Sequence, residues 1–98
     1  MKLHFMHNPG MAETTSSRLL GKMPGRKFLS IQNQHATAIV YIRFDAPAKA
    51  DESSLKIPPG ALYEMRDPCA GEEVNIIATV ACKVNVIEGV SFENHEEI

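Results

Sequence analysis

The chain has 98 residues, of which 44% are hydrophobic and 22% are charged, and its formal net charge is -2. This length fits a single domain, and the composition is that of an ordinary globular protein rather than a collagenous or disordered chain. The longest apolar run, residues 38–42, is far shorter than the roughly 20 residues of a transmembrane helix, so we expect no membrane partner.

Residues 1–25 are predicted to form an extended N-terminal arm. The segment is rich in the Asn, Pro, Gly, Ser and Thr residues that form turns and loops, and it shows little hydrophobic periodicity. Polar residues interrupt the apolar stretch that a secretion signal requires. We expect no core from these residues. The only apolar anchor in the middle is Arg18-Leu19-Leu20, which could dock on a partner or on the domain itself. Met11 resembles a second start, which suggests that the ten residues before it are a translated extension.

From residue 27 onward the pattern changes to short β-strands rich in β-branched and aromatic residues. They are predicted at residues 27–32, 38–44, 55–57, 62–65, 74–80 and 83–87, and Glu88 with Gly89 closes the last one. The first two are expected to pair as a hairpin. Short strands at regular spacing predict an all-β domain over residues 26–90, a small antiparallel β-sandwich or jelly-roll-like barrel. Residues 91–98 are predicted to be an acidic tail.

A rigid turn is predicted at Pro58, Pro59 and Gly60. Proline at Pro59 sets the φ angle that the second position of a type II turn needs, and Gly60 can adopt the positive φ of the third position. The two prolines also remove amide donors that could extend the edge of a sheet. The turn therefore reverses the chain between two of the predicted strands.

The two cysteines, Cys69 and Cys82, are expected to be reduced. We expect no secretion signal, and a secreted domain of this size usually carries several disulfides. Cys82 continues the apolar alternation of its strand and is predicted to lie in the core, whereas Cys69 follows a proline and is predicted to lie in a loop. Tyr41 and Tyr63 lie within apolar strands and are expected to be partly buried, with their hydroxyls at the rim.

No group of residues predicts catalysis or metal binding. His4 and His7 have the spacing of two metal ligands, but no third ligand lies near them. His35, in a turn, and His95, in the tail, are expected to be solvated. The carboxylates occur as adjacent pairs in loops or in the tail, and neither cysteine has the context of a nucleophile. We therefore expect no enzymatic activity, cofactor, metal site or small-molecule substrate.

Charge is distributed unevenly along the chain. Residues 1–27 contain five basic and one acidic side chain, a net charge of +4, whereas residues 28–98 have a net charge of -6. A basic arm on an acidic body favours contact with an acidic protein surface or a neighbouring copy. The alternative is that the charges of a flexible arm have no specific role. Nucleic acid is not an expected partner, because the arm lacks a dense basic cluster with aromatic residues. The predicted partner-binding residues are Arg18, Leu19, Leu20, Lys22 and Arg26.

Four short strings follow one another between residues 26 and 89: RKFLSIQN, IVYIRF, LKIPPGALYE and VNVIEG. In this order they resemble a group of small tailed-bacteriophage virion proteins with the rough pattern R-x-L-x-I-Q-N, I-Y-I-x-F, I-x-P-G-x-x-Y-E and V-x-V-I-E-G. The predicted arm and the acidic tail lie outside the resemblance, so the way in which this chain attaches to a partner is inferred from charge and composition alone.

The resemblance implies a non-enzymatic β-sandwich or jelly-roll-like virion component, such as a capsid decoration or cement protein on the outer surface of the phage head. The implied partners are the major capsid protein and neighbouring copies of the chain, as a homo-oligomer. One alternative is a tail or head-to-tail connector component. Another is a carbohydrate-binding module on a tail fibre, which the absence of Trp and the presence of only two Tyr disfavour.

Overall fold

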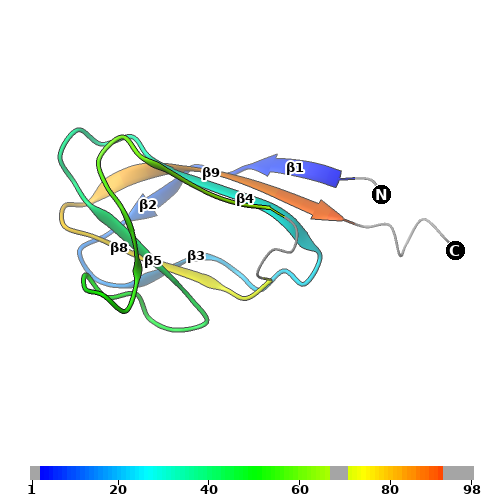
Figure 1. Cartoon of the computed structure of the whole chain (residues 1–98), viewed down its shortest axis with the longest axis horizontal. Helices are drawn as coiled ribbons and strands as arrows, with labels where there is room; N and C mark the ends of the chain where they lie inside the picture. Colours follow the sequence, from blue (N-terminus) through cyan, green and yellow to red (C-terminus); the bar gives the residue numbers. More distant parts are fainter. Residues whose placement is uncertain (1–2, 67–70, 92–98) are drawn as a thin grey trace, which may run out of the picture.

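The structure is a computed structural model that describes residues 3–66 and 71–91, and every regular element in these ranges is a β-strand. The strands are β1 (Leu3–His7), β2 (Gly10–Ala12), β3 (Ser17–Leu20), β4 (Arg26–Asn33), β5 (Val40–Phe44), β6 (Leu55–Ile57), β7 (Leu62–Arg66), β8 (Val74–Ala78) and β9 (Cys82–Ser91). They form two antiparallel layers (Figure 1). Sheet A has the order β1-β9-β4-β7 with β2 also beside β9, and sheet B has the order β3-β8-β5-β6. The predicted all-β sandwich is confirmed.

The strands β1 and β2 continue one another along β9. Leu3 lies opposite Ser91, His7 opposite Ile87 and Gly10 opposite Val84, so the register does not change between the two strands. The amide of Asn8 also donates a hydrogen bond of 2.8 Å to the carbonyl of Val86. Pro9, which follows Asn8, lies between β1 and β2 and has no amide hydrogen.

When β1 and β2 are taken as one strand, the pairing follows a simple rule. The first strand pairs with the last (β9), β3 pairs with β8, β4 with β7, and β5 with β6. This nested order, as if one long hairpin were wound around the core, is that of a jelly roll. It also shows why the hairpin predicted between residues 27–32 and 38–44, now β4 and β5, is wrong. β4 lies in sheet A and β5 in sheet B, so they stack across the core instead of pairing.

The hydrophobic core lies between the sheets and consists of the alternate, inward-facing side chains of most strands. Its members are Ala12, Leu20, Leu29, Ile31, Ala38, Val40, Ile42, Ile57, Val74, Ile76, Ala78, Cys82, Val84 and Val86. Ala12 and Leu20 belong to the segment predicted as an arm without a core, and that prediction is wrong. The segment pairs through β1 and β2 with sheet A and through β3 with sheet B, so residue 25 does not separate an arm from the sandwich.

The predicted turn at Pro58–Gly60 is confirmed. Gly60 has a φ of 75°, and the amide of Ala61 donates a 3.0 Å hydrogen bond to the carbonyl of Pro58, which closes a type II turn. The strands on either side of the turn belong to different sheets, so it carries the chain from the edge of sheet B to the edge of sheet A.

The last strand is longer than predicted, because β9 continues through Glu88 and Gly89 to Ser91. No helix in residues 3–66 and 71–91 is long and apolar enough to cross a membrane. The predictions for Cys69, His95 and the acidic tail beyond Ser91 fall outside the residues that the structure describes.

Candidate functional site

A row of aromatic and cationic side chains crosses the outer face of sheet A, the face turned away from sheet B. The register places Phe5 opposite Gly89, Gly89 opposite Phe28, and Phe28 opposite Arg66, which brings β1, β9, β4 and β7 together. The rings of Phe5 and Phe28 meet edge to face, with their centroids 5.9 Å apart at 72°. The Arg66 guanidinium lies 5.5 Å from the centroid of the Phe28 ring. We call these four residues the aromatic row.

Gly89 allows the two rings of the aromatic row to meet above the strand. A Cβ atom at this position would lie 3.0 Å from the ring of Phe5 and 3.1 Å from the Cβ of Phe28. Any larger residue would therefore push the rings apart. The contact of rings across a glycine stabilises a strand that would otherwise have no side chain to pack at that point. Phe5 nevertheless stays 55% exposed, so its ring is available to another molecule.

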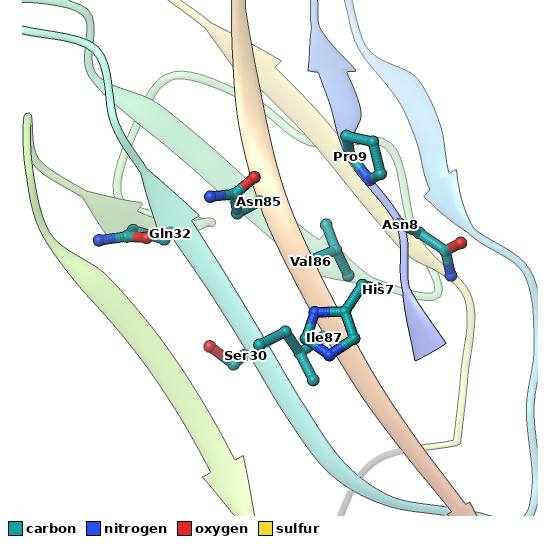
Figure 2. A pocket seen from close by; sticks show the side chains of 8 residues that line it. All are labelled: His7, Asn8, Pro9, Ser30, Gln32, Asn85, Val86 and Ile87. Carbon is teal, nitrogen blue, oxygen red and sulfur yellow. The ribbon is translucent and has the colours of Figure 1, made fainter. Parts of the chain in front are cut away.

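Beside the aromatic row lies a shallow hollow of about 230 Å³, between β4 and the connection of β1 to β2 (Figure 2). Its lining residues are His7, Asn8, Pro9, Ser30, Gln32, Asn85, Val86 and Ile87. None of them is an Asp, Glu, Lys or Arg, and the lining combines amide, hydroxyl and imidazole groups with the apolar Pro9, Val86 and Ile87. Ser30 is only 8% exposed although it points outward, which places it at the floor of the hollow. A neutral ligand with several hydroxyl or amide groups suits this lining better than an ion does.

The two histidines of β1 do not form a metal site. His4 lies opposite Val90 and His7 opposite Ile87, and residues three apart on a strand point to opposite faces of the sheet. Only His7 therefore lines the hollow. Within residues 3–66 and 71–91 no group of three His, Cys, Asp or Glu side chains could hold a metal ion.

The five predicted partner-binding residues do not lie on one surface. Arg18 on β3 and Lys22 after it are exposed, and their contact with a partner stays a prediction. Leu19 is half-buried and packs on the core, in the space that a Cβ atom at Gly10 would fill. Leu20 is 9% exposed and belongs to the core itself. Of the two predicted alternatives, this residue docks on the domain, and its predicted role at a partner surface is wrong.

Arg26 is also buried, at 1% exposed, and its predicted role at a partner surface is wrong. Its Nε donates a 2.7 Å hydrogen bond to Oε2 of Glu88, itself 4% exposed, and the two side chains form an ion pair. Nη1 donates to the carbonyl of Glu72 at 2.8 Å, and Nη2 donates to the carbonyl of Gly21 at 3.0 Å. The arginine thus links β4 to β9 and to the segments around Gly21 and Glu72.

The sequence also predicts whether four further side chains are buried or solvated: Cys82, Tyr41, Tyr63 and His35. Cys82 is 5% exposed within the core, as predicted, and burial raises the pKa of its thiol, which keeps the sulfur protonated at neutral pH. Tyr41 and Tyr63 are partly buried, as predicted. His35 is not simply solvated, because its Nδ1 accepts hydrogen bonds from the amides of Thr37 and Ala38 and holds the connection between the sheets.

Sequence reasoning missed the outer face of sheet A as a candidate site. Ser30, Gln32 and Asn85 could have been recognised as the outward-facing, polar half of the alternation in their strands. Phe5 and His7 could not, because their place beside β9 depends on a pairing between the two ends of the chain.

Comparison with known proteins supports the fold. No family model matches the chain, and no curated protein matches it. Among solved structures, a cupin superfamily protein from Desulfitobacterium hafniense is similar, with a TM-score of 0.50 and 14% identity over 92% of this chain and 79% of that one. A subunit of the disulfide-linked pili of Bacillus endospore appendages has a TM-score of 0.49 and 7% identity, over 92% of this chain and 87% of that one. At this level of identity the cupin similarity is one of fold, that of a small all-β sandwich.

Proposed function

We propose that the protein is a non-enzymatic structural subunit of a tailed-phage virion, and specifically a decoration protein on the outer surface of the head. In this role it binds the major capsid protein and neighbouring copies of itself, and it acts through surface contact. The observation that carries the proposal is the outer face of sheet A, where three large apolar side chains are exposed: Phe5 at 55%, Met11 at 45% and Leu62 at 55%.

These three side chains lie on the face that the core does not use, because they alternate with inward-facing residues of the same strands. They lie along its two edges, with Phe5 and Met11 on one side and Leu62 on the other. Exposed aromatic and apolar side chains of this kind are enriched in protein-binding faces. Jelly rolls are common in viral capsid domains, which agrees with the proposal, although the fold alone assigns no function.

The strings that resemble phage virion proteins contain the residues on which this sandwich depends. Arg26 and Glu88, from the first and last strings, form the buried ion pair, and Gly60 provides the positive φ of the turn. Gly89 lies under the two rings of the aromatic row. The resemblance therefore supports a shared fold first, and the virion role rests on it as an inference.

Quantitative peptide mass spectrometry of virions purified from the source tests the proposal. We expect peptides of this protein in a copy number comparable to that of the major capsid protein, because a decoration protein covers the repeating capsid lattice. A handful of copies per virion would instead support the alternative, a tail or head-to-tail connector component. Absence of the protein from virions would contradict both structural roles.

A second candidate function is a carbohydrate-binding module, and the hollow on sheet A favours it. The amides of Gln32 and Asn85, the hydroxyl of Ser30 and the imidazole of His7 can donate to and accept from sugar hydroxyls. The exposed ring of Phe5 lies two residues before His7 on the same face of β1, and it can cover the apolar face of a sugar.

For this second function we expect binding on a glycan array that weakens roughly tenfold when Asn85 is replaced by alanine, which is the loss of one good hydrogen bond. Lys83→Ala, two residues away on the same face of β9 but outside the lining, is the matched control and should bind like the unchanged protein. An array without hits would exclude carbohydrate binding as the function.

A further inference from the structure

We propose that two copies of this chain join edge to edge through β1, with their sheets A paired antiparallel and centred on Phe5. The inference goes beyond the proposed function, because it concerns the purified chain whether or not the protein occurs in virions. Its partner is a second copy, and the pairing makes one continuous sheet from two.

The argument begins with the edges of the sheets. Among the described residues, sheet A ends at β1 with β2 on one side and at β7 on the other, and sheet B ends at β3 and β6. Edge strands usually carry charged side chains, which oppose pairing with another strand. Three of these edges follow the rule. The strand β7 carries Glu64 and Arg66, β3 carries Arg18, and β6 carries Lys56. Residues 3–12 contain no Asp, Glu, Lys or Arg at all.

The backbone of β1 is oriented to accept another strand. The Asn8 amide bonds to β9, and in an antiparallel pair the residues that bond to one neighbour alternate with those that face the other side. The N–H and C=O groups of Leu3, Phe5 and His7 therefore point away from β9, toward the open edge. Pro9 occupies the next such position and has no N–H to offer. The pairing segment is thus limited to the five residues of β1.

This limit selects the register. If Phe5 of one copy lies opposite Phe5 of the other, Leu3 lies opposite His7. Each residue whose N–H and C=O groups point to the open edge then finds a partner within the segment. Three such pairs exchange about six main-chain hydrogen bonds. A pairing shifted by two residues toward β2 places Leu3 opposite Pro9 and loses a donor. The symmetric register about Phe5 is the one that uses all of the edge.

The same register also covers the exposed ring of Phe5. Side chains directly opposite each other on neighbouring strands have their Cβ atoms about 5 Å apart, and aromatic pairs at such positions are favourable. The Phe5 rings of the two copies then lie side by side on the outer face, and each already contacts its own Phe28. The aromatic rows of the two copies become one row across the joined sheet.

Sedimentation of the full chain across a wide concentration range tests the proposal. We expect a monomer–dimer equilibrium, and we expect Phe5→Lys to raise the dissociation constant at least about tenfold, because it places like charges opposite each other. Leu55→Lys is the matched control: Leu55 is also an exposed apolar side chain, at 44%, on an edge strand, but that strand is β6 at the edge of sheet B. The control variant should dimerise like the unchanged protein.

Cross-linking by single cysteines tests the register without adding charge. In the proposed pairing the two Cα atoms at position 5 are about 5.5 Å apart, which suits a disulfide, whereas those at position 7 are roughly 14 to 15 Å apart. We expect mild oxidation to link Phe5→Cys into dimers and to leave His7→Cys at the level of the unchanged protein, whose own cysteines set the background.

Three results would overturn the proposal. The first is an unchanged chain that sediments as a monomer at every concentration. The second is an equal effect of the Phe5→Lys and Leu55→Lys variants. The third is equal cross-linking of the Phe5→Cys and His7→Cys variants. None of these depends on virions, so this inference can fail while the proposed function holds, and the reverse is equally possible.

Discussion

Replacing Arg26 by methionine is expected to lower the free energy of unfolding by about 3 to 5 kcal/mol, a large part of the total for a domain of this size. Methionine fills a similar volume but leaves the Glu88 carboxylate, which is 4% exposed, without its charged partner. It also removes the donors that reach the carbonyls of Gly21 and Glu72. Removal of one partner is costly because the remaining charge stays away from water.

Equilibrium unfolding in urea measures the effect, with a double-mutant cycle to isolate the pair. Glu88→Leu alone should lose a similar amount, and the combination with Arg26→Met should lose clearly less than the sum of the two. Arg66→Met is the control, because Arg66 also pairs with a glutamate, Glu64, but its side chain is 76% exposed. We expect that control to lose no more than about 1 kcal/mol. Equal losses for Arg26→Met and Arg66→Met would contradict the role given to the buried pair.

Replacing Asn33 by leucine is expected to cost about 3 kcal/mol or more, although the two side chains have similar volumes. Asn33 is fully buried, and its Nδ2 donates to the carbonyls of Ala38 at 2.8 Å and Ile57 at 3.0 Å. Its Oδ1 accepts a 3.1 Å hydrogen bond from the amide of His35. Leucine leaves three backbone groups without this partner, and each buried group that loses its hydrogen bond costs about 1 to 3 kcal/mol.

The matched control is Asn85→Leu, because Asn85 is exposed on the outer face of sheet A. We expect its free energy of unfolding to change by no more than about 0.5 kcal/mol. Urea unfolding of both variants, read by the same probe, decides the matter. A loss of less than 1 kcal/mol in Asn33→Leu, on the order of a single exposed hydrogen bond, would mean that water replaces the amide at this corner.

Local patterns in the sequence predicted most of the strands. The alternation of apolar residues located β4 and most of β9, and it placed Cys82 in the core, because alternation follows from the pleat of a single strand. The chemistry of Pro59 and Gly60 predicted the turn, since it depends only on their own φ angles.

The pairing of strands was beyond such reasoning. Nothing local distinguishes two strands that pair from two that stack across a core, so β4 and β5 were assigned to a hairpin. The segment from residue 3 to residue 20 looked like an arm because its strands are short and are separated by Pro, Gly, Ser and Thr. Its partners, β9 and β8, lie more than 50 residues away in the sequence.

The candidate site could not be predicted either, because it also depends on the pairing of distant strands. The wrong prediction for Arg26 has a different cause, which is its charge. Arg26 was counted with the basic arm, because arginine is seldom buried without a partner. The partner, Glu88, is 62 positions away, where the sequence predicts the end of a strand. The outer face of sheet A likewise becomes visible only when β1 is placed beside β9.

The nested pairing has a consequence for the order of events during synthesis. In the part of the chain that the structure describes, β1 and β2 pair with β9 alone, so the first strand to leave the ribosome waits for the last before it can pair. Contacts between such distant segments make folding slow, because a long loop must close before any pairing energy is gained. Throughout that delay the uncharged β1 segment is exposed on the nascent chain. A chaperone that shields apolar N-terminal segments should therefore raise the yield of native protein, and most strongly when many ribosomes translate one message side by side.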